Sequence, residues 1–134
     1  MANNIGPCLG AGLIVQGTGL IINLAGHTVT GAGSNPAGAI DQAGIHLDNA
    51  TRVTLKGGTV RAFFVGVLVK GGSGNTITNM KVMDNVGLGT TVYNDGIVLD
   101  GSTRNTVASN TVTGNGPDAG IAMVNSANSN RIQR

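Results

Sequence analysis

Apolar residues recur at every second position within a unit that is repeated along the chain. The unit is clearest in GIHLDNATRVTLKGGTV, which begins at Gly44, and it returns in GVLVKGGSGNTITNMKV from Gly66 and GIVLDGSTRNTVASNTV from Gly96. A shorter copy, GIAMVNSANSNRI, begins at Gly120, and an earlier copy begins at Gly12. A period of two is typical of a β-strand, because successive side chains point to opposite faces. Each unit of about 22 residues therefore predicts three short strands.

The repeat predicts a solenoid in which each strand pairs in parallel with its counterpart in the next unit. The copies start at residues 12, 44, 66, 96 and 120, which gives about five coils of about 22–24 residues once two insertions are set aside. Such stacking satisfies the backbone hydrogen bonds everywhere except at the two ends. We expect one domain over residues 1–134, with an irregular lead-in at 1–11, coils over 12–134, and inserted loops at 31–43 and 86–95.

Stacking aligns the apolar positions of successive units into columns, and these columns are the predicted core. The columns are Ile45/Val67/Ile97/Ile121, Leu47/Val69/Leu99/Met123, Val53 or Leu55 with Ile77 and Val107, and Val60/Val82/Val112. In the first coil, the expected matches are Ile22 with Val53, Leu24 with Leu55, and Val29 with Val60. The core is thus expected to be almost entirely aliphatic.

Glycine and asparagine stand where the coil must turn a corner. The first corner has Asn49, Gly71, Gly101 and Asn125, and the second has Gly57-Gly58, Asn79 and Asn110. Both residue types enter the left-handed backbone region at low energetic cost. Asparagine side chains at stacked corners are also expected to hydrogen-bond up and down the stack.

Three kinds of segment carry a family resemblance. They are the GIxL starts at Gly44 and Gly96, the NTI and NTV segments at Asn75 and Asn105, and NLAGHTVTG from Asn23, which is similar to an LDLNGHTITG opening segment. Over about residues 12–132 the chain resembles the right-handed parallel β-helix family, of the pectate-lyase-like and NosD-like kind. The resemblance implies an all-β, right-handed, single-stranded parallel β-helix, and right-handed crossovers are the usual ones. It also implies an extracellular or cell-surface location, in a family that holds lyases, hydrolases, epimerases, phage tail proteins and non-enzymatic surface proteins.

Composition narrows the classes of partner. The chain has 23 glycines, 2% aromatic and 10% charged residues, a net charge of +2, and aspartate as its only acid. Scattered lysines and arginines without interleaved aromatics argue against nucleic-acid binding. The apolar run Leu20-Ile21-Ile22 is too short to cross a membrane, and the start MANNIGPCLG lacks the regions of a signal peptide. The single cysteine, Cys8, cannot form an internal disulfide.

One outward column at the end of the first strand collects chemistry-bearing side chains. Its members are Gln16, Asp48, Lys70, Asp100 and Val124, with neighbouring strands about 4.8 Å apart. In the family that the chain resembles, a polysaccharide groove follows this face, bordered by long loops. The candidate substrate-binding residues are therefore His46, Asp48, Lys70, Asp100, Arg52, Arg104 and, in the second insertion, Tyr93.

The column has two interpretations. As a site, it would use Lys70 and Asp100 as the candidate catalytic residues, with Asp48 and Asp100 as ligands if a cation such as calcium binds. No other cofactor and no metal cluster is expected. As a structural ladder, alternating Asp, Lys and Asp charges would balance one another and stabilise the fold by only about 0–1 kcal/mol. The clustered aspartates with a nearby histidine that mark catalytic relatives are missing.

The sequence favours a non-catalytic surface or carbohydrate-binding module whose partner is a polysaccharide. One alternative is a polysaccharide lyase or glycoside hydrolase with a groove along the first strand, so enzyme activity stays open. Another is a structural stalk or assembly segment. The last copy stops before its coil is complete, so we expect either self-association through the open C-terminal coil or a fragment of a longer β-helix. An ice-binding threonine array is disfavoured because Arg61, Lys81 and Met83 interrupt the third-strand column.

Overall fold

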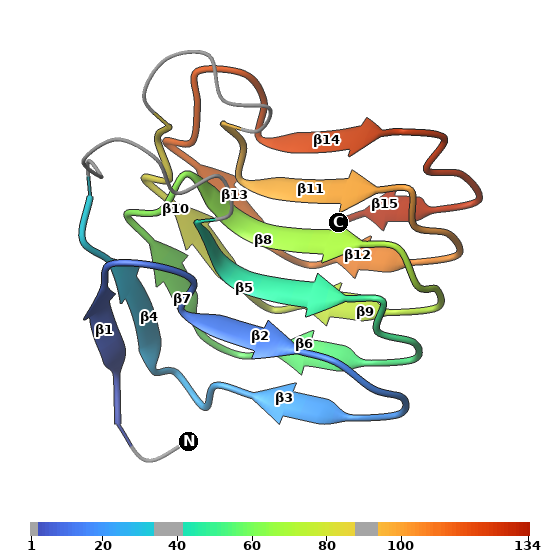
Figure 1. The fold of residues 1–134 in the computed structure, drawn as a ribbon, viewed down its shortest axis with the longest axis horizontal. Coiled ribbons are helices and arrows are strands. Elements are labelled where there is room, and N and C mark those ends of the chain that lie inside the picture. The colour runs from blue at the N-terminus through green and yellow to red at the C-terminus, as the bar shows by residue number, and fades with distance from the viewer. Residues whose placement is uncertain (1–2, 34–41, 88–93) are drawn as a thin grey trace.

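The fold is a stack of coils built only from strands, in the parts of the chain that the structure describes. The structure is a computed structural model, and it describes residues 3–33, 42–87 and 94–134. Its strands form three parallel sheets, each 5-stranded. Figure 1 shows the coils stacked from β1, β2 and β3 at one end to β14 at the other. The expected all-β parallel solenoid of about five coils is confirmed.

Each sheet collects one strand from every coil. The first sheet holds β2 (Leu13–Val15), β5 (Ala43–Asp48), β8 (Val65–Lys70), β11 (Ile97–Asp100) and β14 (Ile121–Val124). The second sheet holds β3 (Ile21–Asn23), β6 (Thr54–Lys56), β9 (Thr76–Thr78), β12 (Thr106–Ala108) and β15 (Arg131–Gln133). The third sheet holds β1 (Ile5–Cys8), β4 (Thr28–Gly31), β7 (Thr59–Arg61), β10 (Lys81–Met83) and β13 (Thr111–Thr113). The chain therefore visits the three sheets in turn.

The predicted apolar columns form the interior. The register aligns Ile45/Val67/Ile97/Ile121, Leu47/Val69/Leu99/Met123 and Val60/Val82/Val112. In the second sheet Leu55, not Val53, stands in register with Ile77 and Val107. Most of these side chains are fully buried, but Met123, in the last described coil, is 52% exposed. Its predicted core role is wrong in this structure because no further strand covers that end of the column.

The first coil is offset from the predicted match. Ile22 pairs with Leu55, because the turn between β3 and β4 is two residues longer than the turn between β6 and β7. Leu24, expected beside Leu55, lies in that longer turn and is fully buried. A Cβ on Gly58 would lie 2.3 Å from the Leu24 Cβ atom. Leu24 thus fills the space that the glycine leaves open, whereas Val29 pairs with Val60 as predicted.

The corners use left-handed backbone, mostly at the predicted residues. Asn49, Gly71, Gly101 and Asn125 at the first corner have φ values of 49°, 63°, 56° and 51°. At the second corner Gly57 and Asn79 adopt this conformation, but in the fourth coil Ser109 does so in place of Asn110. The Asn110 side chain instead accepts a hydrogen bond from the Met80 backbone N–H at 2.9 Å.

Two ladders of asparagine side chains run through the stack. In the first ladder Asn75, Asn105 and Asn130 each accept a hydrogen bond, at 2.8–2.9 Å, from a backbone N–H of the preceding coil. In the second ladder Asn85 and Asn115 do the same at 3.1 Å. Stacked asparagines were predicted, but the ladders use the NTI and NTV segments and the third corner. These positions face inward, so their amides satisfy backbone groups that water cannot reach.

The glycine that opens the units at Gly44, Gly66 and Gly96 is required by close packing. A Cβ on Gly44 would lie 2.2 Å from the Val60 Cγ1 atom, and a Cβ on Gly66 would lie 2.3 Å from the Val82 Cγ1 atom. No real side chain tolerates such distances. The motif therefore marks where the first sheet meets the valines of the third sheet.

The predicted lead-in and insertions need correction. The chain is not irregular throughout 1–11, because β1 pairs with β4 in the third sheet, with a register shift between Ile5 and Cys8. Strands β4 and β5 also extend into the predicted 31–43 loop, and Val86, at the start of the 86–95 loop, forms a bridge with Gly116. The remaining parts of both loops, 34–41 and 88–93, lie outside the described residues.

Candidate functional site

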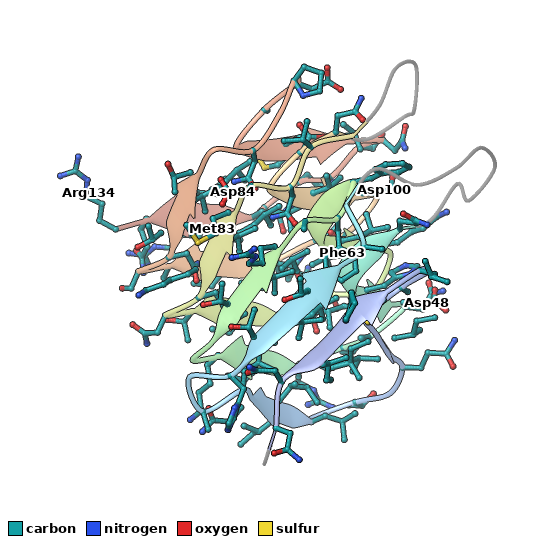
Figure 2. The ribbon with its side chains drawn as sticks, turned by 90° about the vertical axis from the view of Figure 1, so that its left-hand side faces the viewer. Asp48, Phe63, Met83, Asp84, Asp100 and Arg134 are labelled. Carbon is teal, nitrogen blue, oxygen red and sulfur yellow. The ribbon has the colours of Figure 1, made fainter. Side chains whose placement is uncertain are left out.

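The predicted outward column lies at the ends of the first-sheet strands. Asp48 is in register with Lys70, and Lys70 is in register with Asp100. Gln16, one residue beyond β2, donates its Nε2–H to Asp48 Oδ2 at 2.6 Å. We call Gln16, Asp48, Lys70 and Asp100 the polar row. Figure 2 places Asp48 and Asp100 on the same side of the molecule. The row continues in β14 with the apolar Val124.

Corner asparagines hold both carboxylates of the polar row. Asn49 Nδ2 donates to Asp48 Oδ1 at 3.0 Å, and Asn125 Nδ2 donates to Asp100 Oδ1 at 2.6 Å. Asp100 is only 6% exposed, whereas Asp48 is half-buried and Lys70 is exposed. The part of the row that a large ligand can reach therefore runs from Gln16 through Asp48 to Lys70.

The two candidate arginines belong to the corner rather than to the row. Arg52 and Arg104 have φ values of 54° and 55°, the left-handed conformation that Gly19 and Gly74 adopt at equivalent positions of other coils. Both arginine side chains are exposed at the end of the corner that leads into the second sheet. They flank the row without forming part of it.

The outward column next to the polar row is mostly apolar, and it is buried at strands β8 and β11. His46, a candidate binding residue, is half-buried there, in register with Ile14 on one side and Leu68 on the other. Leu68 and the next residue in this column, Val98, are 2% and 0% exposed and belong to a hydrophobic cluster separate from the interior. A groove along the whole face is therefore not available at β8 and β11. Tyr93, the remaining candidate, lies outside the described residues.

An acidic pair that the sequence did not single out lies where the chain enters the first sheet. Asp95 is 4% exposed, and its Oδ1 accepts a hydrogen bond from Ala119 N–H at 2.7 Å. Asn94 Nδ2 donates to Asp118 Oδ2 at 3.2 Å. Burial raises the pKa of Asp95 above its ordinary value of 3.8, and the charge of Asp118 raises it further. The signal was available, because Asp95 comes one residue, and Asp118 two residues, before the glycine starts of adjacent coils.

A small hollow opens at the corner between the second and third sheets. Its volume is about 230 Å³. It is lined by Gly26, Gly57, Gly58, Thr59, Asn79 and Lys81. Sequence reasoning assigned Gly57 and Gly58 only to a turn, so the hollow was not predicted.

A family model agrees with the architecture. The model described as "Right handed beta helix region" matches residues 3–134. The chain belongs to the right-handed β-helix family. The β-helix is therefore right-handed, as the resemblance implied. No curated protein and no solved structure gives a significant match to the chain.

Two further properties of the β-helix bear on its partners. Within residues 3–33, 42–87 and 94–134, no three side chains of His, Cys, Asp or Glu gather closely enough to hold a metal ion. The candidate calcium ligands Asp48 and Asp100 lie on strands separated by β8. The same part of the chain has no helix that is long and apolar enough to cross a membrane.

Proposed function

We propose that this β-helix is a non-catalytic module that binds a polysaccharide along the polar row. The observation that carries the proposal is the register of Asp48, Lys70 and Asp100, which puts one polar side chain per coil in line. Parallel strands repeat about every 4.8 Å, so the row offers evenly spaced donors and acceptors. A polymer with repeating hydroxyl or carboxyl groups is the ligand class that matches such a row. The proposed location is extracellular or at the cell surface, where such polymers occur.

The hydrogen bonding of the carboxylates favours binding over catalysis. A general base must come within hydrogen-bond reach of the proton that it removes. Asp100 is nearly fully buried and already accepts a hydrogen bond from Asn125, and Asp48 accepts hydrogen bonds from Gln16 and Asn49. These contacts hold the acids in place and leave Lys70 as the most accessible charged group of the row.

Affinity electrophoresis in gels that contain neutral or uronate-bearing polysaccharides tests the proposal. At least one polymer should retard the wild-type protein. Loss of one hydrogen bond to a charged group corresponds to about 1.5–3 kcal/mol, so Lys70→Ala should weaken binding about tenfold or more. Arg131→Ala, on the second sheet, is the matched control and should bind as the wild type does. Unchanged retardation of the double variant Gln16→Ala/Lys70→Ala would contradict the proposal.

The same polymers test the enzymatic alternative. The protein is incubated with each polymer, with and without calcium, and new reducing ends and unsaturated products are measured. We expect no product. Product that forms with the wild type and disappears with Lys70→Ala would replace the binding proposal with a polysaccharide lyase or hydrolase.

Assembly through the last described coil is a second candidate function, and one observation favours it. Met123 and Ile132 continue interior columns, yet they are 52% and 45% exposed. Exposed apolar side chains beside unpaired strand edges favour association with another chain. Light scattering after size exclusion should show oligomers of residues 1–134 that dissociate in Met123→Lys/Ile132→Lys. A monomer at all concentrations would contradict this candidate.

A further inference from the structure

Three glycines line the hollow at the corner between the second and third sheets. Gly26 lies in the turn of the first coil, and Gly57 and Gly58 form the turn of the second coil. In the third coil the same turn carries Asn79 and Met80. Part of the wall of the hollow is therefore bare backbone, and the third coil adds the Asn79 side chain.

The remaining walls supply polar groups of a defined kind. Lys81 begins β10 and stands in register with Thr59, which begins β7. Both side chains point outward, because Val60 and Val82, the next residues along the two strands, are fully buried. Asn79 adds an exposed amide from the adjoining turn. The lining thus offers one ammonium, one hydroxyl and one amide, and it includes no carboxylate.

The surroundings of the hollow are positively charged. As the structure describes them, the strands of the second and third sheets hold Lys56, Arg61, Lys81 and Arg131 and no acid. Asp84 is the nearest acid along the chain to Lys81, and it lies beyond the other end of β10, about 10 Å away at the usual rise of a strand. Such a distance is about one Debye length in physiological salt, so the attraction of Asp84 is largely screened. In Figure 2, Asp48 and Asp100 lie on the side opposite Arg134, the cation at the end of the chain.

We propose that this corner hollow binds a single uronic acid residue of an acidic saccharide. The sugar carboxylate would face the Lys81 ammonium, and ring hydroxyls would face Thr59 and Asn79. A volume of about 230 Å³ is below the roughly 300–1,000 Å³ of pockets for drug-sized ligands, which suits one sugar residue. The described strands of these two sheets carry no aromatic side chain on which a nucleic-acid base could stack. The site is separate from the polar row.

Residue-resolved NMR titration of ¹⁵N-labelled protein tests the assignment. Sodium glucuronate should shift the backbone amides of Gly26, Gly57, Gly58 and Asn79 in a saturable way, and glucose at equal concentration should not. Lys81→Ala should weaken glucuronate binding about tenfold or more, as expected for a hydrogen bond to a charged group. Lys81→Arg should retain most of the affinity, and Arg104→Ala, at the first corner, should bind as the wild type does.

Several outcomes would overturn the assignment. They are equal shifts with glucose and glucuronate, shifts that persist in Lys81→Ala, and shifts with sodium sulfate but not with glucuronate. Tighter binding of a short single-stranded DNA would show a general polyanion surface instead. Because the titration uses a monosaccharide and the amides of this corner, its result is independent of whether the polar row binds a polymer.

Discussion

The asparagine ladder makes a quantitative prediction at Asn75, which is fully buried. Its Oδ1 accepts a hydrogen bond from Val53 N–H at 2.9 Å, and its Nδ2 donates to Ala50 O at 2.9 Å and to Asn105 Oδ1 at 3.0 Å. Asn75→Ala removes all of these side-chain bonds at once. The change therefore tests whether the ladder holds neighbouring coils together.

The expected loss follows from which groups are left without a partner. Val53 is fully buried, so its orphaned N–H should cost about 1–3 kcal/mol. Ala50 O still accepts from Ser73 N–H at 3.3 Å, and Asn105 Oδ1 still accepts from Asn75 N–H at 2.9 Å. Those two acceptors lose only a net hydrogen bond each, about 0.5–1.5 kcal/mol. The free energy of unfolding should fall by about 2–6 kcal/mol, a large share of the roughly 5–15 kcal/mol of a typical domain.

Urea denaturation followed by far-ultraviolet circular dichroism measures this loss. Asn128→Ala is the matched control, because Asn128 is exposed and its side chain bonds to its exposed neighbours, donating to Ser126 O and accepting from Ser129 Oγ. Its effect should stay within about 0.5 kcal/mol. If Asn75→Ala does not fold, Asn130→Ala at the last rung should still lose about 1–3 kcal/mol or more, since it removes the acceptor of Asn105 N–H and Asn105 Nδ2 and the donor to Ser102 O. Equal stabilities of Asn75→Ala and Asn128→Ala would refute the reasoning.

Three further predictions concern packing, an unsatisfied hydroxyl and pH. Gly66→Ala should lower the free energy of unfolding by about 1–3 kcal/mol or more, because its Cβ would press on Val82. Gly120→Ala is the control, because a Cβ there would lie 3.5 Å from its nearest contact. Equal urea midpoints of the two variants would contradict this prediction. Ser102→Ala should raise stability by about 1 kcal/mol, because Ser102 Oγ is buried without a partner among the described residues, and a lower melting temperature would contradict this. The raised pKa of Asp95 means that its proton binds more tightly in the folded state, so its stabilising contribution is full below pH 3.8 and is lost as pH rises through the folded pKa. Asp95→Asn should remove that fall in the urea midpoint, and parallel pH profiles would count against the assignment.

Sequence alternation predicted the strands, their parallel pairing and most core columns for one physical reason. Each inward position contacts its equivalent in the next coil, so the same apolar character and a similar volume are needed at that position in every coil. The predicted register of Asp48, Lys70 and Asp100 follows from the same repetition. The offset at Ile22 was not predictable from the matching letters, because a longer turn lets Leu24 occupy the space beside Gly58.

The site could be predicted only in part. The continuous apolar run VGVLVK in β8 is typical of a strand that is buried on both faces, but this signal was not used, and a groove was expected along the whole face. The corner hollow depends on glycines from two different coils and on Lys81 from a third, a proximity that appears only once the turns are placed. The corner role of Arg52 was hidden because glycine and arginine alternate at that position.

The measurement that tests the proposed function most directly is an amide NMR titration with the polysaccharide that retards the protein most. The account predicts that the largest shifts fall on the polar row and its corner, at Gln16, Asp48, Asn49, Lys70 and Gly71, while the polymer stays intact. Largest shifts on the opposite sheets, or cleavage of the polymer during the titration, would contradict it.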